Sequence, residues 1–228
     1  MDGVVCLQGG GEFSVGCRPM DEALLAHVDG PVVVTALAGE VGRDYRTATA
    51  NGVAHFRAVG ATEVHAAPDV REEPAAALAV LRSARLLVLP GGSPSRLLQV
   101  LTTTAVGELV AELLGTGGAV MGASAGAMVL CPWTVLPDRR GSAGPAVARG
   151  LGVVPGVLVM PHWNGGSGRT DWLCAVREQV PDDVQVLGLP EESGVVVRGA
   201  ALTAVGRRAS TLVNDERELA LGETWSLS

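Results

Sequence analysis

The sequence predicts an α/β fold: a doubly wound, mostly parallel sheet with helices on both faces and antiparallel strands toward the C-terminus. Short continuous apolar runs, such as residues 86–89, are typical of strands that are covered on both faces. Helix-like segments separate these runs over residues 4–121, which is the pattern of a parallel sheet. Because neither a linker nor a repeat interrupts the chain, we expect a single domain over residues 1–228.

In the first half of the chain, strands and helices alternate. Apolar, often β-branched runs predict strands at 4–7, 31–36, 62–66, 86–89 and 119–121. Helical patterns, two of them opened by a proline near the first turn, predict helices at 19–28, 43–59, 70–84, 94–101 and 104–114. Ligands of such sheets bind at the carboxyl ends of the strands, so the residues that follow each strand are the candidates for function.

The pattern loosens after about residue 135. A polar, glycine-rich loop is expected at 139–145, and a helix is expected at 171–180. Further strands are predicted at 157–160, 184–187, 194–198, 200–205 and near 212 and 219. We expect the last of these to be antiparallel strands that complete the sheet.

Charge and composition exclude several classes of protein. The net charge is −7, which argues against a nucleic-acid partner, and all 17 basic residues are arginine. Without lysine, the chain has no Schiff-base lysine and no P-loop lysine. The four cysteines lack the spacing of a metal site, and Cys6 and Cys174 are expected to be buried thiols. We therefore expect no metal and no cofactor.

The N-terminus has neither a basic segment nor a long apolar run, and no stretch is apolar over the length of a membrane span. A cytoplasmic protein without a membrane partner is the expectation, and a homodimer is left open.

Residues 122–126 read Gly-Ala-Ser-Ala-Gly between an apolar strand and an apolar helix. This is the pattern of a nucleophile elbow, in which two glycines let a strand and a helix come close and a serine projects from the turn. Ser124 is therefore the candidate nucleophile. The same residues would also suit a turn of small residues that only packs a helix onto a strand and has no catalytic role.

A serine nucleophile needs a base and a group that orients the base. His162 follows a predicted strand and is the first candidate base, with His65 as the alternative. His27 and His55 lie in helical segments and are expected on the surface or as satisfied core residues. The candidate acids are Asp138, Glu191 and Glu192, whereas Asp171 suits the cap or first turn of a helix.

Two backbone amides would hold the oxyanion. Ala125 begins the helix after the elbow, and the second amide is expected from Gly92 or Ser93. Ser93 followed by proline also suits the cap of a helix. The glycine run at 9–11 lacks the spacing of a dinucleotide-binding fingerprint.

Several of these segments together resemble peptidase family S51, which includes dipeptidase E and the cyanophycinases. They are Gln8–Glu12, Leu89–Gly92, Gly122–Ala127 and Pro161–His162. The resemblance covers residues 4–197 and implies a class I glutamine amidotransferase-like fold. It also implies that Ser124 is the nucleophile, that His162 is the base and that Gly92 and Ala125 are the oxyanion donors. In that family the acid lies between the serine and the histidine, which favours Asp138.

The chain departs from the family in the segment 163–173, where Arg169 is the only basic residue. One arginine could still clamp the carboxylate of an aspartyl substrate. The richer arginine pattern of cyanophycinases is missing. The resemblance thus implies a serine peptidase or amidohydrolase for a short peptide or other small amide, with an aspartyl dipeptide as one candidate. The alternatives are a non-catalytic binding member of the fold, and an esterase or acyl transferase with the same triad.

Overall fold

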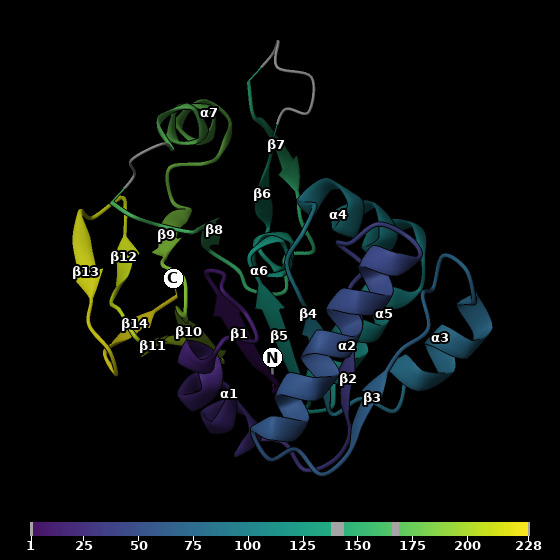
Figure 1. Ribbon diagram of the computed structural model, residues 1–228. Coiled ribbons are helices and arrows are strands. Elements are labelled where there is room, and N and C mark those ends of the chain that lie inside the picture. Colours follow the sequence, from purple (N-terminus) through teal and green to yellow (C-terminus); the bar gives the residue numbers. More distant parts are fainter. Residues whose placement is uncertain (1, 138–143, 166–168, 228) are drawn as a thin grey trace.

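The computed structural model describes residues 2–137, 144–165 and 169–227. In these residues an eight-stranded sheet has the order β14-β11-β10-β1-β5-β4-β2-β3. Its parallel strands are β1 (Val4–Gln8), β5 (Ala119–Ala123), β4 (Leu86–Leu89), β2 (Val32–Val34) and β3 (Val64–Ala66). On the other side of β1 are the antiparallel strands β10 (Ser193–Arg198), β11 (Ala201–Gly206) and β14 (Thr224–Ser226). The predicted fold class is confirmed (Figure 1).

Helices cover both faces of this sheet, as the apolar runs predict. Cys6 on β1 belongs to the buried cluster beneath α1 and α2, together with Met20 and Phe56. Its neighbour Leu7 belongs to the cluster on the opposite face. The first face carries α1 (Arg18–Leu25), which a short 3₁₀ turn at Val15–Cys17 precedes, and α2 (Arg43–Ala58). The opposite face carries α3 (Pro74–Leu81), α4 (Pro94–Thr103), α5 (Val106–Gly115) and α6 (Ala125–Leu130).

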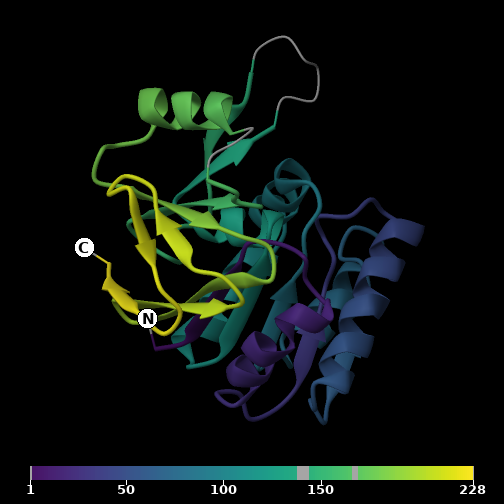
Figure 2. The same cartoon turned by 60° about the vertical axis from the view of Figure 1, so that its left-hand side comes forward.

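A second sheet, of four strands in the described chain, lies beside α6 and has the order β13-β12-β9-β8. Its parallel strands β8 (Val157–Pro161) and β9 (Gln185–Leu189) are joined through α7 (Thr170–Gln179). Strand β12 (Ser210–Leu212) pairs antiparallel with β9, and β13 (Arg217–Leu219) pairs antiparallel with β12 at the edge of the sheet. In Figure 2 the C-terminal strands, in yellow, lie below α7, in green.

The second sheet corrects one expectation. The C-terminal strands do not all complete the large sheet, since β12 and β13 belong to the smaller one. The large sheet is extended beyond β10 by β11 and β14, whereas β12 pairs with β9, whose other neighbour is β8.

Some local expectations also change. A hairpin of β6 (Trp133–Leu136) and β7 (Ala146–Arg149) flanks the predicted glycine-rich loop. The third helix begins at Pro74 rather than at residue 70, because residues 70–73 form turns on the Asp69 carbonyl. The thiol of Cys174 is exposed, not buried as expected, whereas that of Cys6 is buried.

Within the described part of the chain, no single helix is both long and apolar enough to cross a membrane. Only α4 and α5 taken together, bent by 81° where they meet, reach that length and composition.

Candidate active site

Ser124 lies in the tight turn between β5 and α6. Its backbone has φ 48° and ψ −108°, a conformation that is strained for a residue with a side chain. A Cβ on Gly122 would lie 2.6 Å from the carbonyl carbon of Gly126, and a Cβ on Gly126 would collide with the Leu89 carbonyl oxygen. Glycine is therefore required at both positions, and the turn has the geometry that the motif predicts.

A chain of two hydrogen bonds starts at this serine. Ser124 Oγ lies 3.0 Å from His162 Nε2, and His162 Nδ1 lies 3.0 Å from Glu191 Oε1. If Glu191 accepts the proton on Nδ1, the Nε2 lone pair faces the serine hydroxyl. The arrangement is that of a nucleophile, a base and an orienting carboxylate.

Three consecutive carbonyls at the end of β1 hold this chain of residues in place. The carbonyl oxygens of Gln8, Gly9 and Gly10 accept hydrogen bonds from the amides of Ser124, His162 and Glu192, each at 2.8 Å. Sequence reasoning assigned no such role to the glycine run. The signal was present, because only glycine lets three chain segments approach the backbone so closely: a Cβ on Gly10 would lie 2.6 Å from His162 Nδ1.

Four of the non-glycine residues with positive φ lie in the segments that build this site: Phe13, Ser124, His162 and Glu192, with φ between 48° and 67°. Such conformations cost free energy and persist only where the surroundings hold them. These four residues lie where the loops of the site meet, so backbone strain is concentrated at the junction of these loops.

Of the candidate acids in the described part of the chain, Glu191 is the one that contacts His162. Its neighbour Glu192 instead accepts hydrogen bonds from Ser14 Oγ (2.7 Å) and from the Arg207 guanidinium (2.8 Å), which hold its pKa below the ordinary value. Asp138 lies outside the described residues.

The backbone amides around the serine differ in what they already bind. The Ser93 amide donates to the Ala38 carbonyl at 3.0 Å, and its hydroxyl accepts the Arg96 amide as the cap of α4. In the described residues the Gly92 amide has no such partner, and Ala125 is the first residue of α6, so its amide has none within the helix. Gly92 and Ala125 are thus the amides left to donate to an oxyanion.

Glu12 is a further residue at the site, which sequence reasoning quoted only within a motif. Its Oε1 accepts a hydrogen bond of 2.6 Å from the amide of Gly91, the residue before Gly92. A Cβ on Gly91 would lie 2.7 Å from this oxygen and 3.2 Å from Ser124 Cβ, so the carboxylate and the serine lie close together.

Arg169 supports the strand that leads to His162. Its guanidinium donates to the Pro161 carbonyl at 3.1 Å and lies 4.4 Å from the centre of the Trp172 ring. Partial burial lowers the pKa of this arginine from its ordinary value. These contacts keep Arg169 near the site, with further N–H groups in its fork.

The other histidines lie apart from Ser124. His55 is buried and its Nε2 lies 2.7 Å from Oδ2 of the buried Asp21, as expected of a satisfied core residue. His65 lies on the edge strand β3 and contacts the exposed Glu63. Neither contacts the serine, so the alternative base is not supported by the geometry.

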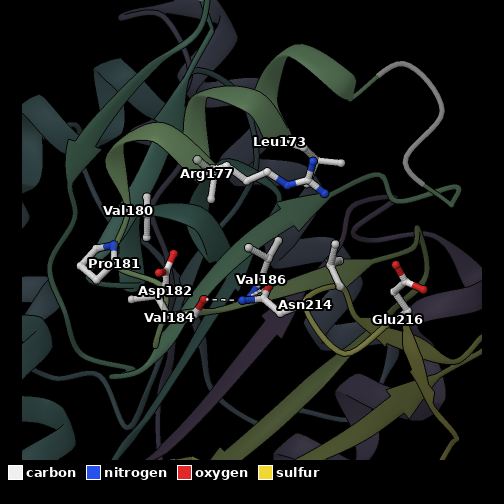
Figure 3. Close-up of a pocket in the computed structure, with 11 residues that line it drawn as sticks. Leu173, Arg177, Val180, Pro181, Asp182, Val184, Val186, Asn214 and Glu216 are labelled. Carbon is white, nitrogen blue, oxygen red and sulfur yellow. Dashed lines mark hydrogen bonds between the residues drawn. The ribbon is translucent and has the colours of Figure 1, made fainter.

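Among the described residues, no group of three or more histidine, cysteine and acidic side chains could hold a metal ion. A cavity of about 260 Å³ lies next to α7, between residues such as Val176, Val186 and Asn214 (Figure 3). Ser124, His162 and Glu191 do not line it.

Comparison with known proteins matches the family model of peptidase family S51 to residues 35–205. Peptidase E of Streptomyces coelicolor is 31% identical over 160 residues, and this match spans 65% of the chain and 65% of the length of that relative. The crystal structure of a peptidase from an acI-B1 Actinobacterium superposes with a TM-score of 0.82 at 24% identity, over 98% of this chain and 96% of the other.

A putative peptidase E from Listeria monocytogenes superposes with a TM-score of 0.62 at 18% identity, over 90% of this chain and 98% of the other. The two structures share the fold described above. The family match covers well over half of the sequence, and the chain therefore belongs to peptidase family S51.

Proposed function

We propose that this chain is a serine peptidase or amidohydrolase that cleaves a short peptide or other small amide through Ser124, His162 and Glu191. The observation that carries the proposal is the pair of 3.0 Å contacts from Ser124 through His162 to Glu191, at a strained turn after a buried strand. Membership of peptidase family S51 supports the same reaction class.

In the proposed reaction, Ser124 Oγ attacks the scissile carbonyl carbon while His162 Nε2 takes the hydroxyl proton. Glu191 stabilises the imidazolium that forms and keeps its Nδ1–H in place. The amides of Gly92 and Ala125 donate to the oxyanion of the tetrahedral intermediate. His162 then protonates the leaving amine. In the second half of the reaction His162 takes a proton from the water that attacks the acyl-enzyme, and it returns this proton to Ser124 Oγ as the ester bond breaks and the acid product leaves.

Glu191 takes the place that the family resemblance gave to Asp138. The proposal rests on its contact with His162 at 3.0 Å. An orienting acid can come from any point in the sequence, because triads are recognised by geometry and not by order along the chain.

An aspartyl dipeptide is one candidate substrate, and Arg169 is the residue that would bind its side-chain carboxylate. In support, Arg169 contacts the carbonyl of the residue before His162. A panel of dipeptides with and without an N-terminal aspartate tests this, and equal turnover of both kinds would contradict it.

A fluorophosphonate probe tests the nucleophile. The wild-type protein and Ser83→Ala, a control at an exposed serine just after the end of α3, should be labelled equally, and Ser124→Ala should not be labelled. Mass spectrometry of the dipeptide reactions gives a second readout. Equal hydrolysis by wild type and Ser124→Ala would show that Ser124 is not the nucleophile, and no hydrolysis by either together with no labelling would favour a non-catalytic member of the fold.

A further inference from the structure

The amides on either side of Gly92 are both bonded to other segments of the chain. The Gly91 amide donates to Glu12 Oε1 at 2.6 Å, and the Ser93 amide donates to the Ala38 carbonyl at 3.0 Å. The Gly92 amide between them has no backbone partner within the described residues. The bonds of its two neighbours therefore fix the direction in which this N–H points.

Two consecutive glycines make this part of the backbone easy to rotate. A change in ψ of Gly91 and in φ of Gly92 flips the peptide group between them and places a carbonyl oxygen where the N–H had pointed. An oxygen at that place would repel the oxyanion that the amide is proposed to stabilise. Gly92 has φ +137°, and a Cβ there would lie 2.8 Å from the Ala38 carbonyl oxygen, so a stiffer residue does not fit. The orientation must be held from outside the glycine pair.

The Ala38 carbonyl is held by Arg96, the third residue of α4. Arg96 Nη1 donates to this carbonyl oxygen at 2.8 Å, and Arg96 Nη2 lies 3.1 Å from Glu40 Oε1. A carbonyl oxygen has two lone pairs, and here the Arg96 guanidinium and the Ser93 amide use both of them. The Arg96 side chain is only 22% exposed, so water competes weakly for this contact.

Other contacts fasten the rest of the loop after β2. The Gly39 carbonyl accepts a hydrogen bond from Arg71 Nη1 at 3.0 Å, and the Glu40 amide donates to Asp44 Oδ2 at 2.7 Å. These bonds tie the loop to α2 and to the turn before α3. Among the side chains that the structure describes, Arg96 is the one that ties it to α4. Loss of Arg96 should therefore loosen the connection to the glycine pair and leave the loop itself folded.

Resting on the proposed function, we propose that Arg96 is a positioning residue for the oxyanion site. Its guanidinium keeps the Ala38 carbonyl in place as the acceptor of the Ser93 amide. This bond in turn keeps the Gly92 N–H directed toward the carbonyl oxygen under attack. Because the oxyanion forms only during the reaction, this support stabilises the transition state and contributes little to substrate binding.

An arginine near an active site can instead bind a carboxylate of the substrate. In that case Arg96→Ala would raise KM for acidic substrates and leave kcat nearly normal. Arg96→Lys separates the two roles further, because lysine keeps the charge but lacks the fork that reaches the Ala38 carbonyl and Glu40 together. A role of charge alone predicts that lysine restores activity, whereas the positioning role predicts a kcat well below that of the wild type.

Steady-state kinetics on acidic and neutral dipeptides tests the proposal. Arg96→Ala should lower kcat by at least about tenfold for both kinds, a part of the about 10²–10³-fold that the loss of a whole oxyanion donor costs. KM should change by less than about threefold, because the ground state contains no oxyanion. Arg57→Ala is the matched control, since Arg57 on α2 also donates to a backbone carbonyl, that of Val64 at 3.2 Å, and its loss should leave kcat unchanged.

A binding measurement makes the result independent of turnover. A peptide aldehyde adds reversibly to the serine and forms an oxyanion, whereas a dipeptide bound to the Ser124→Ala variant forms none. Calorimetry should show that Arg96→Ala weakens aldehyde binding by at least about tenfold. Introduced into Ser124→Ala, the same change should leave dipeptide binding nearly unaltered, which also shows that the protein is folded.

Three results would overturn the role of Arg96: a raised KM at normal kcat, normal kcat in Arg96→Lys, or equal losses of aldehyde and dipeptide binding. A different result would count against the proposed function itself. If Ser124→Ala hydrolyses the dipeptides as fast as the wild type, Ser124 is not the nucleophile and the site has no oxyanion of this kind to stabilise.

Discussion

His162 contacts Glu191 through Nδ1, on the side of the ring opposite Ser124, and Glu191 is followed directly by a glutamate that points elsewhere. The neighbours differ because Glu192 has φ +56° and is drawn to Ser14 and Arg207. The turn after β9 thereby presents one carboxylate to the histidine and uses the other to fasten itself to the loop after β1.

This difference predicts unequal effects of two isosteric changes. Glu191→Gln should lower kcat by about 10³–10⁴-fold, because it removes the charge that orients and stabilises the imidazolium. Glu192→Gln should cost less than about tenfold, since glutamine still accepts from Ser14 and the Arg207 side of the ion pair is exposed to solvent. Steady-state kinetics on one dipeptide decides the matter, and equal losses in the two variants would contradict the assignment.

Gly10 should be needed for activity more than for folding. Gly10→Ala places a Cβ against the His162 ring and should lower kcat/KM by at least about tenfold by displacing the base. Gly60→Ala is the matched control, because Gly60 also has positive φ (101°) but has nothing within 4 Å of its Cβ position. Both variants should lose about 1 kcal/mol of unfolding free energy from backbone strain, so a normal kcat/KM in Gly10→Ala would refute the close contact.

The contacts of Glu192 predict a pH dependence of stability. Its pKa in the folded protein lies below the ordinary value of 4.5, because Ser14 and Arg207 stabilise the ionised form. A lowered pKa means that the contribution is present above the unfolded value and is lost as the pH falls through the folded one. Urea unfolding should therefore show a difference between wild type and Glu192→Gln at about pH 7 that shrinks below about pH 4.5. A difference that grows on acidification would be inconsistent with this sign.

The thiols should react at very different rates. Cys174 is exposed, whereas Cys6, Cys17 and Cys131 are buried. Burial raises the pKa of Cys17 to about 11 and that of Cys131 to about 12, so little thiolate forms there at neutral pH. A disulfide reagent should modify one thiol rapidly in the native protein and all four after unfolding. Cys174→Ser should remove the fast phase, and its persistence would show that another thiol is accessible.

The sequence predicted the parallel core of the fold because each of its strands is a local apolar run. β4 (Leu86–Leu89) was predicted with its observed bounds, and Ser124 was placed correctly in a turn after β5. These features depend on residues that are neighbours in the chain. Burial on both faces leaves a continuous apolar pattern, and a tight turn requires glycines at fixed offsets.

By itself the sequence thus determined the α/β class, the elbow at Ser124 and the choice of His162 as the base to be tested. Only the tertiary structure decided that Glu191 and not Glu192 faces this histidine, that β12 and β13 belong to a second sheet, and that Glu12 lies beside the serine. The physical reason is that these relationships join segments far apart in the chain. They depend on which strand edges, carbonyl groups and charged side chains remain unpaired after the core has packed. A local sequence pattern does not contain this information.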